Sequence, residues 1–272
     1  MKNQLLAFMA ALGLVAFFSC QNQPKPPVAP QPLTVGSNHF NKQDGKDCTK
    51  PDTLQLDCAT IDLSWPKVEN GSEVLKKSVN DWAVDYVTGI MAGYDSVGTP
   101  INANSIETAA DMFFKSRQEY MQEAPDSPGM VWTAECTDTV LLNDGQYLTL
   151  QLNSYSFQGG AHGSPLAAVA TFNDSTGVQL TWNDLVTDTT ALKTLMQQKF
   201  EKERADIFKP EDGSEPFQFD EIFQFKLPDN YGLVKDGIYC YYVVYEVGPY
   251  AFGETTFTLT FNELGALSNI KK

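Results

Sequence analysis

Residues 143–152, Asn-Asp-Gly-Gln-Tyr-Leu-Thr-Leu-Gln-Leu, decide the fold class of this chain. The Asp-Gly pair is a signal of tight hairpin turns. After it, Leu148, Leu150 and Leu152 recur at every second position, which is the pattern of a half-buried strand. Residues 132–136 show the same period before the turn. The stretch therefore predicts two neighbouring antiparallel strands.

The two-residue period extends in both directions from this hairpin. Earlier in the chain it predicts a strand over residues 54–65, which Pro66 is expected to end because proline has no N–H to donate to a neighbouring strand. Residues 217–225 alternate aromatic and polar side chains. Four more strands are predicted after the hairpin, at 166–172, 178–182, 238–247 and 255–261.

Helical spacing replaces this pattern in three segments. The first begins with Asn70, which has the spacing of a capping box with Glu73, and ends at Gly93. The second begins at Asn104, and the third extends from the cap residue Asp188 to about residue 206. Helices are therefore inserted between groups of strands and do not alternate with single strands.

This order of elements predicts an α+β fold with a mainly antiparallel sheet and inserted helices. About 220 residues remain after the N-terminal segments, enough for one large domain or two small ones. We expect two intimately packed subdomains, residues 34–130 and residues 131–272.

The first nineteen residues have the pattern of a signal peptide. Lys2 precedes an apolar run from Leu5 to Phe18, which is too short to span a bilayer comfortably. The run ends at Ser19-Cys20, which resembles the lipobox of bacterial lipoproteins, where the cysteine carries the lipid. Residues 20–33 then form a proline-rich tether. We expect lipidation at Cys20 and a periplasmic position, with surface export left open; a plain secreted protein is the alternative.

The chain is acidic, with a formal net charge of −15 at pH 7. An acidic chain without a basic cluster argues against nucleic acid and against anionic lipid headgroups as partners. It permits a basic protein partner. A plain alternative is that the charge keeps the domain dispersed.

Four cysteines follow Cys20, an even number that fits disulfides in an oxidising compartment. Cys48 and Cys58 flank a turn and can pair. Cys136 and Cys240 lie in strand-like runs, where a second disulfide and two buried thiols are both possible. The chain has no Cys-x-x-Cys pair, so we predict no metal site and no cofactor.

The segment Gly159-Gly160-Ala161-His162-Gly163 places a histidine in a glycine-rich turn after a predicted strand. Glycine adopts positive φ and lets a partner approach the backbone closely, which is typical of a binding site or of a tight structural turn. His162 can serve as a general base, as a donor to a ligand or as a structural pin. A base needs an orienting partner, for which Glu246 and Glu254 are the candidates.

Three motifs in a fixed order carry a resemblance to a known family. The glycine–histidine segment comes first, Leu-Thr-Trp-Asn-Asp-Leu follows at 180–185, and Tyr-Glu-Val-Gly-Pro-Tyr-Ala-Phe-Gly follows at 245–253. Together they resemble the RsiV-like extracytoplasmic domain, which occurs in a lysozyme-sensing anti-sigma factor and as the accessory region of the peptidoglycan deacetylase PdaC. The resemblance covers roughly 150–267, and residues 54–125 fit the PdaC-accessory-like partner region.

The resemblance implies a binding or sensing domain outside the cytoplasm, and more a binding protein than an enzyme. The metal-binding motif of the deacetylase domain is absent, because residues 171–174 are interpreted as a strand end followed by a turn. We expect the loops at 158–163 and 246–254 to lie side by side. The candidate ligand-binding residues are Gly159, Gly160, His162, Gly163, Glu246, Tyr250 and Glu254.

The function predicted at this point is recognition of an envelope ligand by a lipid-anchored protein. The expected partner is a basic, lysozyme-like protein or a peptidoglycan fragment, and the membrane is contacted through the lipid on Cys20. The alternative is a hydrolase or deacetylase of cell-wall glycans that uses His162 and a carboxylate. The sequence leaves the ligand, the oligomeric state and the occurrence of catalysis open.

Overall fold

The computed structural model describes residues 31–51, 57–92, 103–123, 131–211 and 213–270. The signal segment, Cys20 and most of the proposed tether lie outside the described residues. Leu33, at the end of the tether, exchanges two hydrogen bonds of 2.8 Å with the Asn143 side chain. These two bonds attach Leu33 to the folded part of the chain.

Two sheets form the centre of the fold, and both follow the chain in order. The larger sheet contains β1 (Val35–Asp44), β2 (Ala59–Val68), β3 (Trp132–Asn143), β4 (Tyr147–Phe157) and β5 (Ser164–Asn173). The smaller sheet contains β6 (Asn230–Val234), β7 (Gly237–Tyr242) and β8 (Thr255–Thr260). The helices are α1 (Glu73–Ala92), α2 (Ile106–Glu123), α3 (Trp182–Leu185), α4 (Thr189–Glu203), α5 (Ala205–Phe208) and α6 (Phe261–Leu264).

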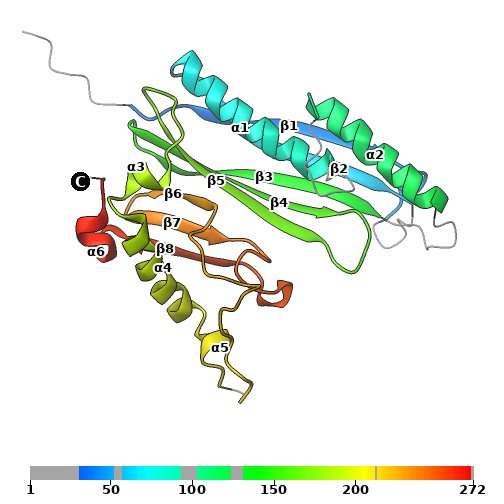
Figure 1. Ribbon diagram of the computed structural model, residues 1–272. Helices are drawn as coiled ribbons and strands as arrows, with labels where there is room; N and C mark the ends of the chain where they lie inside the picture. The colour runs from blue at the N-terminus through cyan, green and yellow to red at the C-terminus, as the bar shows by residue number, and fades with distance from the viewer. Residues whose placement is uncertain (1–30, 52–56, 93–102, 124–130, 212, 271–272) are drawn as a thin grey trace, which may run out of the picture.

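The elements form four layers (Figure 1). Helices α1 and α2 cover one face of the larger sheet, the smaller sheet lies on its other side, and α4 packs against the smaller sheet. Within the described strands, β2 and β3 are the one parallel pair, and every other pair is antiparallel. The α+β class with mainly antiparallel sheets is thus confirmed.

The alternation in β4 separates two different environments, as its pattern predicts. Leu148, Leu150 and Leu152 are fully buried in the cores that contain the helices. Thr149, between them, points toward the smaller sheet and bonds to Thr171 of β5 at 2.9 Å. One face of β4 therefore packs on helices and the other on the second sheet.

Side chains join the two sheets where β5 meets β6. The Leu233 amide of β6 donates to the Thr171 hydroxyl at 2.8 Å, and the Val169 amide of β5 donates to the Asn230 side chain at 3.3 Å. Buried amides need such partners, since an unpaired one is costly. The predicted boundary at residue 131 falls between β2 and β3, which are paired within one sheet.

Gly232 lets β6 approach β5 closely. A Cβ atom there would lie 2.5 Å from Thr149 Cγ2 and 3.0 Å from Thr171 Oγ1. We expect Gly232→Ala to lower the free energy of unfolding by about 1–3 kcal/mol, because β-branched buried neighbours cannot move aside. Gly89→Ala is the control, since open space surrounds Gly89 within helix α1. It should raise stability by up to about 1 kcal/mol. Denaturant unfolding measures the change in unfolding free energy for both variants. Equal changes in the two would contradict the close approach of β6 to β5.

Several predicted boundaries differ from the structure. Helix α1 is capped by Ser72, whose hydroxyl accepts the Leu75 amide, while Asn70 instead holds the Thr34 amide. The second helix is capped by Ser105, one residue after the predicted start. Gly93 lies outside the described residues. Asp188 caps α4 as predicted, but that helix ends at Glu203, and the short α5 follows it.

One predicted strand was wrong, two others were shifted, and the alternation noted at 217–225 does not correspond to a strand. Residues 178–182 form only a bridge at Gln179, because Thr181 caps α3 with Asp184. Residues 217–225 form no strand. The predicted strand 54–65 has three residues outside the described part and continues through Pro66 to Val68. The proline is tolerated because pairing with β3 stops at Leu63, which leaves β2 one neighbour there.

The strand predicted over 238–247 ends early, at Tyr242 of β7. After it, the chain turns, and the Glu246 carboxylate accepts the amides of Val243 and Asp229 at 3.0 and 2.9 Å. This turn begins the second motif loop. The final predicted strand, 255–261, agrees with β8 apart from its last residue.

The four cysteines after Cys20 occur in two states. Cys48 and Cys58 form a disulfide, and Cys136 and Cys240 are buried free thiols. Burial raises the pKa of the Cys136 thiol to about 12, which makes it a weak nucleophile at neutral pH. None of the helices in the described part of the chain has the length and hydropathy needed to cross a bilayer.

Candidate functional site

The glycine-rich loop connects β4 to β5 and needs its glycines for two reasons. Gly159 and Gly160 have φ values of 92° and 97°, which residues with a side chain rarely adopt. Gly163 has no such φ, but a Cβ atom on it would lie 2.3 Å from the Tyr155 ring. The loop therefore folds closely over Tyr155, a half-exposed residue of β4.

The second loop follows β7 and contains an unusual backbone conformation. Tyr245 has a φ of 67°, the one positive φ of a non-glycine residue within the described ranges, and its side chain is 56% exposed. Such a conformation is strained for a bulky residue. Further along, Tyr250–Phe252 form a 3₁₀ turn that Gly253 ends with a φ of 68°.

The two loops lie side by side, which confirms that prediction. The rings of His162 and Tyr250 stack with centroids 3.8 Å apart and planes 21° apart. The Tyr250 hydroxyl donates to the Gly163 carbonyl at 3.1 Å. Residues more than 80 positions apart in the sequence thus form one surface.

The contacts of His162 determine its tautomer. His162 Nδ1 lies 2.9 Å from the Gly163 carbonyl, which can only accept, so Nδ1 carries the proton. The Tyr245 hydroxyl lies 3.5 Å from Nε2, the other ring nitrogen. Tyr245 and Tyr250 therefore contact the imidazole from two sides.

The expected carboxylate partner of His162 is absent from the contacts of the described residues. Glu246 is almost fully buried in its own loop, where it accepts two backbone amides and lies 3.6 Å from Lys226 Nζ. Burial raises the pKa of Glu246 above its ordinary value. Glu254 instead hydrogen-bonds Tyr241, and burial together with this contact raises the pKa of that tyrosine. Glu246 thus holds the loop in place.

A cavity of about 570 Å³ opens beside the glycine-rich loop. His162, Ser164 and Gln158 line it from the loop side, and Asp85 and Tyr86 line it from α1. The Tyr86 hydroxyl hydrogen-bonds Ser154 at 2.8 Å, and burial raises its pKa. The cavity therefore offers hydroxyl, amide and carboxylate groups next to exposed aromatic rings.

This arrangement suits contact with a ligand better than catalysis. A histidine base needs an orienting carboxylate and usually a nucleophile within hydrogen-bond reach. Among the residues that the structure describes, His162 has no carboxylate partner, and it makes no hydrogen bond to Ser164. Within the described ranges, no group of three or more His, Cys, Asp or Glu side chains is arranged to hold a metal ion.

Three residues of this site were not predicted from the sequence. Asp85 and Tyr86 belong to α1, for which the spacing predicted a helix and no site. Tyr245 fell within the strand predicted over 238–247. Its position just before Gly248-Pro249 was a signal that the strand had already ended.

The Asn173–Gly177 turn contains a carboxylate with an unfavourable environment. Both Asp174 oxygens are shielded from solvent and have no hydrogen-bond partner in the described part of the chain. Burial, with the nearby Asp144 charge, raises the Asp174 pKa to about 6. A raised acid pKa adds stability at low pH, and this contribution is lost as the pH rises through the folded-state value.

We therefore expect Asp174→Asn to stabilise the protein at about pH 7 by about 1 kcal/mol, allowing for solvent screening, and to have little effect near pH 4. Thermal unfolding at the two pH values measures this difference. Asp188→Asn, at the α4 cap, is a control that should not stabilise the protein at either pH. A variant at Asp174 with equal stability changes at both pH values would contradict the raised pKa.

Two family comparisons match successive parts of the chain. Residues 53–165 match a family described as Deacetylase PdaC, and residues 183–262 match a family described as protein of unknown function DUF3298. The chain joins a PdaC-like segment to a DUF3298-like segment. The resemblance expected from the three motifs is confirmed. His162 falls in the first segment and Tyr250 in the second, so the candidate site lies where the two segments meet.

Solved structures support the same fold. A DUF3298 family member from Bacteroides fragilis NCTC 9343 is 18% identical, with a TM-score of 0.63 over 89% of this chain and 96% of that chain. A DUF3298 family protein from Pseudomonas aeruginosa PAO1 is 15% identical, with a TM-score of 0.58 over 88% of this chain and 96% of that chain. No curated protein sequence matches this chain.

Proposed function

We propose that this chain is a lipid-anchored binding module of the cell envelope, held at the periplasmic face through Cys20. The observation that carries the proposal is the His162–Tyr250 stack, which joins two distant loops into one exposed aromatic surface. The disulfide between Cys48 and Cys58 supports an oxidising compartment. The likeness to the PdaC family supports a place outside the cytoplasm.

The local energetics support binding as the role of this surface. Tyr245 is held in a strained backbone conformation while its ring remains mostly in solvent. Strain of this kind amounts to about 1–3 kcal/mol and concentrates at ligand contacts. Tyrosine also supplies contact area at a low loss of side-chain entropy. A ring positioned in this way is prepared for a partner.

The ligand that we propose is a basic, lysozyme-like protein or a peptidoglycan fragment. The net charge of −15 speeds encounter with a basic protein, and Asp85 adds a carboxylate at the cavity itself. The salt dependence of binding distinguishes these two ligands. Screening weakens the attraction between charged proteins and has little effect on binding of a neutral glycan. The contacts of His162 do not favour the hydrolase alternative.

The test immobilises residues 33–272 and measures binding of two probes, a basic lysozyme and soluble muropeptides, at low and high salt. We expect one probe to bind the wild type and to lose binding with Tyr245→Ala. Val178→Ala removes an equally exposed apolar side chain from a distant turn and should bind as the wild type does. Wild-type protein that retains neither probe, or equal losses in both variants, would overturn the proposal.

A further inference from the structure

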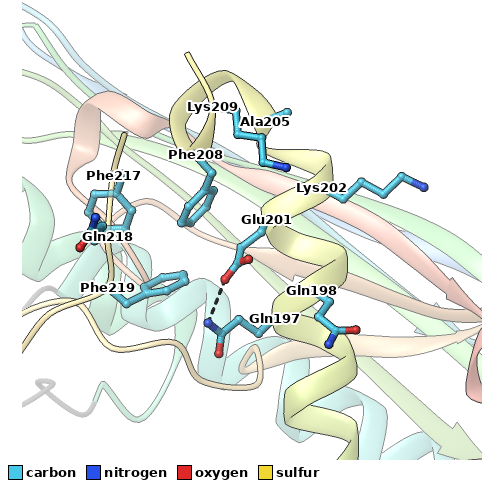
Figure 2. Close-up of a pocket in the computed structure, with 10 residues that line it drawn as sticks. All are labelled: Gln197, Gln198, Glu201, Lys202, Ala205, Phe208, Lys209, Phe217, Gln218 and Phe219. Carbon is cyan, nitrogen blue, oxygen red and sulfur yellow. Dashed lines mark hydrogen bonds between the residues drawn. The ribbon is translucent and has the colours of Figure 1, made fainter. Parts of the chain in front are cut away.

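A second groove lies between helix α4, helix α5 and the extended segment around Phe217. It is on the side of the smaller sheet that is turned away from the larger sheet (Figure 1). It has a volume of about 630 Å³ (Figure 2). A neighbouring hollow of about 460 Å³ shares Gln197 and Phe219 with it. The two therefore adjoin each other.

Phenylalanine rings form one wall of this groove. Phe208 lies 5.4 Å from Phe219 and 5.7 Å from Phe217, measured between ring centroids. All three rings are half-buried and therefore keep part of their area in water. Figure 2 shows Phe208 and Phe219 facing the interior of the groove. These rings give the groove an apolar wall that a ligand can cover.

Amide and carboxylate groups form the other wall. The Gln197 amide donates to the Glu201 carboxylate at 2.9 Å, and both side chains point from α4 toward the rings (Figure 2). Neither group has a second hydrogen-bond partner among the described residues, so Gln197 keeps an oxygen and an N–H, and Glu201 keeps an oxygen. Gln218 adds a further amide from the extended segment.

We propose that this groove binds a saccharide chain. Sugars present flat C–H faces, which aromatic rings attract through their negative faces, and hydroxyl edges, which amides and carboxylates bind. The groove places these two kinds of surface opposite each other. An extended peptide would use an unpaired strand edge, and the residues that line the groove belong to no strand. The two adjoining hollows give room for more than one sugar unit.

The groove is connected to the second motif loop through Phe217. Phe252 packs edge-on against Phe217, with centroids 4.8 Å apart, and a Cβ on Gly248 would contact the Phe252 ring. Tyr250, two residues earlier, stacks on His162. The loop thus separates two distinct sites, and the saccharide proposal does not depend on what the His162 surface binds.

Isothermal titration of residues 33–272 with chitotetraose and cellotetraose tests the groove. We expect binding of at least one tetrasaccharide, weakened about tenfold by Phe217→Ala and by Gln197→Ala. Gln218→Ala, at an exposed position, changes a side chain outside the core and should also weaken binding. Lys235→Ala, in the β6–β7 turn, is the control. Thermal unfolding confirms that each variant is folded.

His162→Ala separates this proposal from the proposed function. It should leave tetrasaccharide binding unchanged while it weakens binding of the lysozyme or muropeptide probe. Loss of tetrasaccharide binding in His162→Ala, with retention in the groove variants, would overturn the groove and support the His162 surface as the sugar site. Absence of tetrasaccharide binding by the wild type would overturn the groove alone.

Discussion

Tyr250→Ala is expected to weaken binding of the proposed envelope ligand by about thirtyfold, or about 2 kcal/mol, as is common for a tyrosine at the centre of an interface. The substitution removes the stack on His162 and the hydrogen bond to the Gly163 carbonyl, so it releases two loops at once. The dissociation constant for the probe that the wild type binds measures the effect, with unfolding curves recorded for each protein.

Tyr250→Phe is the matched control. It keeps the stacked ring and removes only the hydroxyl that bonds to Gly163, so we expect a loss of about 1 kcal/mol or less. The informative result is whether Tyr250→Ala loses more binding free energy than Tyr250→Phe. A folded Tyr250→Ala protein that binds as tightly as the wild type would show that the stack is a structural corner without a role in recognition.

Removal of the Cys48–Cys58 disulfide is expected to lower the free energy of unfolding by about 2–3 kcal/mol. The bond closes a short loop, with a sequence separation of 10, and constrains the unfolded chain. Denaturant unfolding of the Cys48→Ser/Cys58→Ser variant measures the loss. The bond lies close to β2, and its loss should therefore destabilise the larger sheet.

Reductant supplies the internal control for this prediction. It should destabilise the wild type by the same amount and leave the double variant unchanged, because Cys136 and Cys240 are already free thiols. If reductant destabilised the double variant as well, a second disulfide would have to exist, and the assignment of the buried thiols would be wrong.

The antiparallel hairpin could be predicted because local signals specify it. Asp144 and Gly145 favour a tight turn, and the three leucines of β4 mark its buried face. Strand β1 could not be predicted in the same way. It lies at the edge of the sheet, where only Val35 and Phe40 pack against the cores, so its sequence shows no apolar alternation.

The end of β7 shows a different limit. The run from Ile238 to Val247 contains four tyrosines, which fit both a strand and an exposed loop, so the pattern continues past the true end at Tyr242. The turn that follows Tyr242 is fixed by the Glu246 carboxylate, which accepts the backbone amides of Val243 and Asp229. Tertiary hydrogen bonding of this kind leaves no periodic signal in the sequence.

The site could be predicted in part. Glycines around His162 and the motif at 245–253 marked two loops, and the family resemblance suggested that they meet. The sequence could not show which side chain faces the imidazole, because that depends on the packing of the two sheets. Carboxylates were the expected partners, but Tyr250 and Tyr245 contact the ring.

The position of the site suggests why the two family segments occur together. His162 belongs to the segment that matches PdaC, and Tyr250 belongs to the segment that matches DUF3298. The sheets that carry them are joined by buried hydrogen bonds at Thr171 and Asn230. Neither segment by itself contains both halves of the aromatic surface.

Photo-crosslinking from position 245 in the full-length protein, in its native envelope, tests most directly whether the two loops form one recognition surface. The account predicts one defined adduct with p-benzoylphenylalanine at position 245, its loss when His162→Ala is added, and no such adduct from position 178. Equal adducts from positions 245 and 178, or an adduct at 245 that persists without the imidazole, would contradict it.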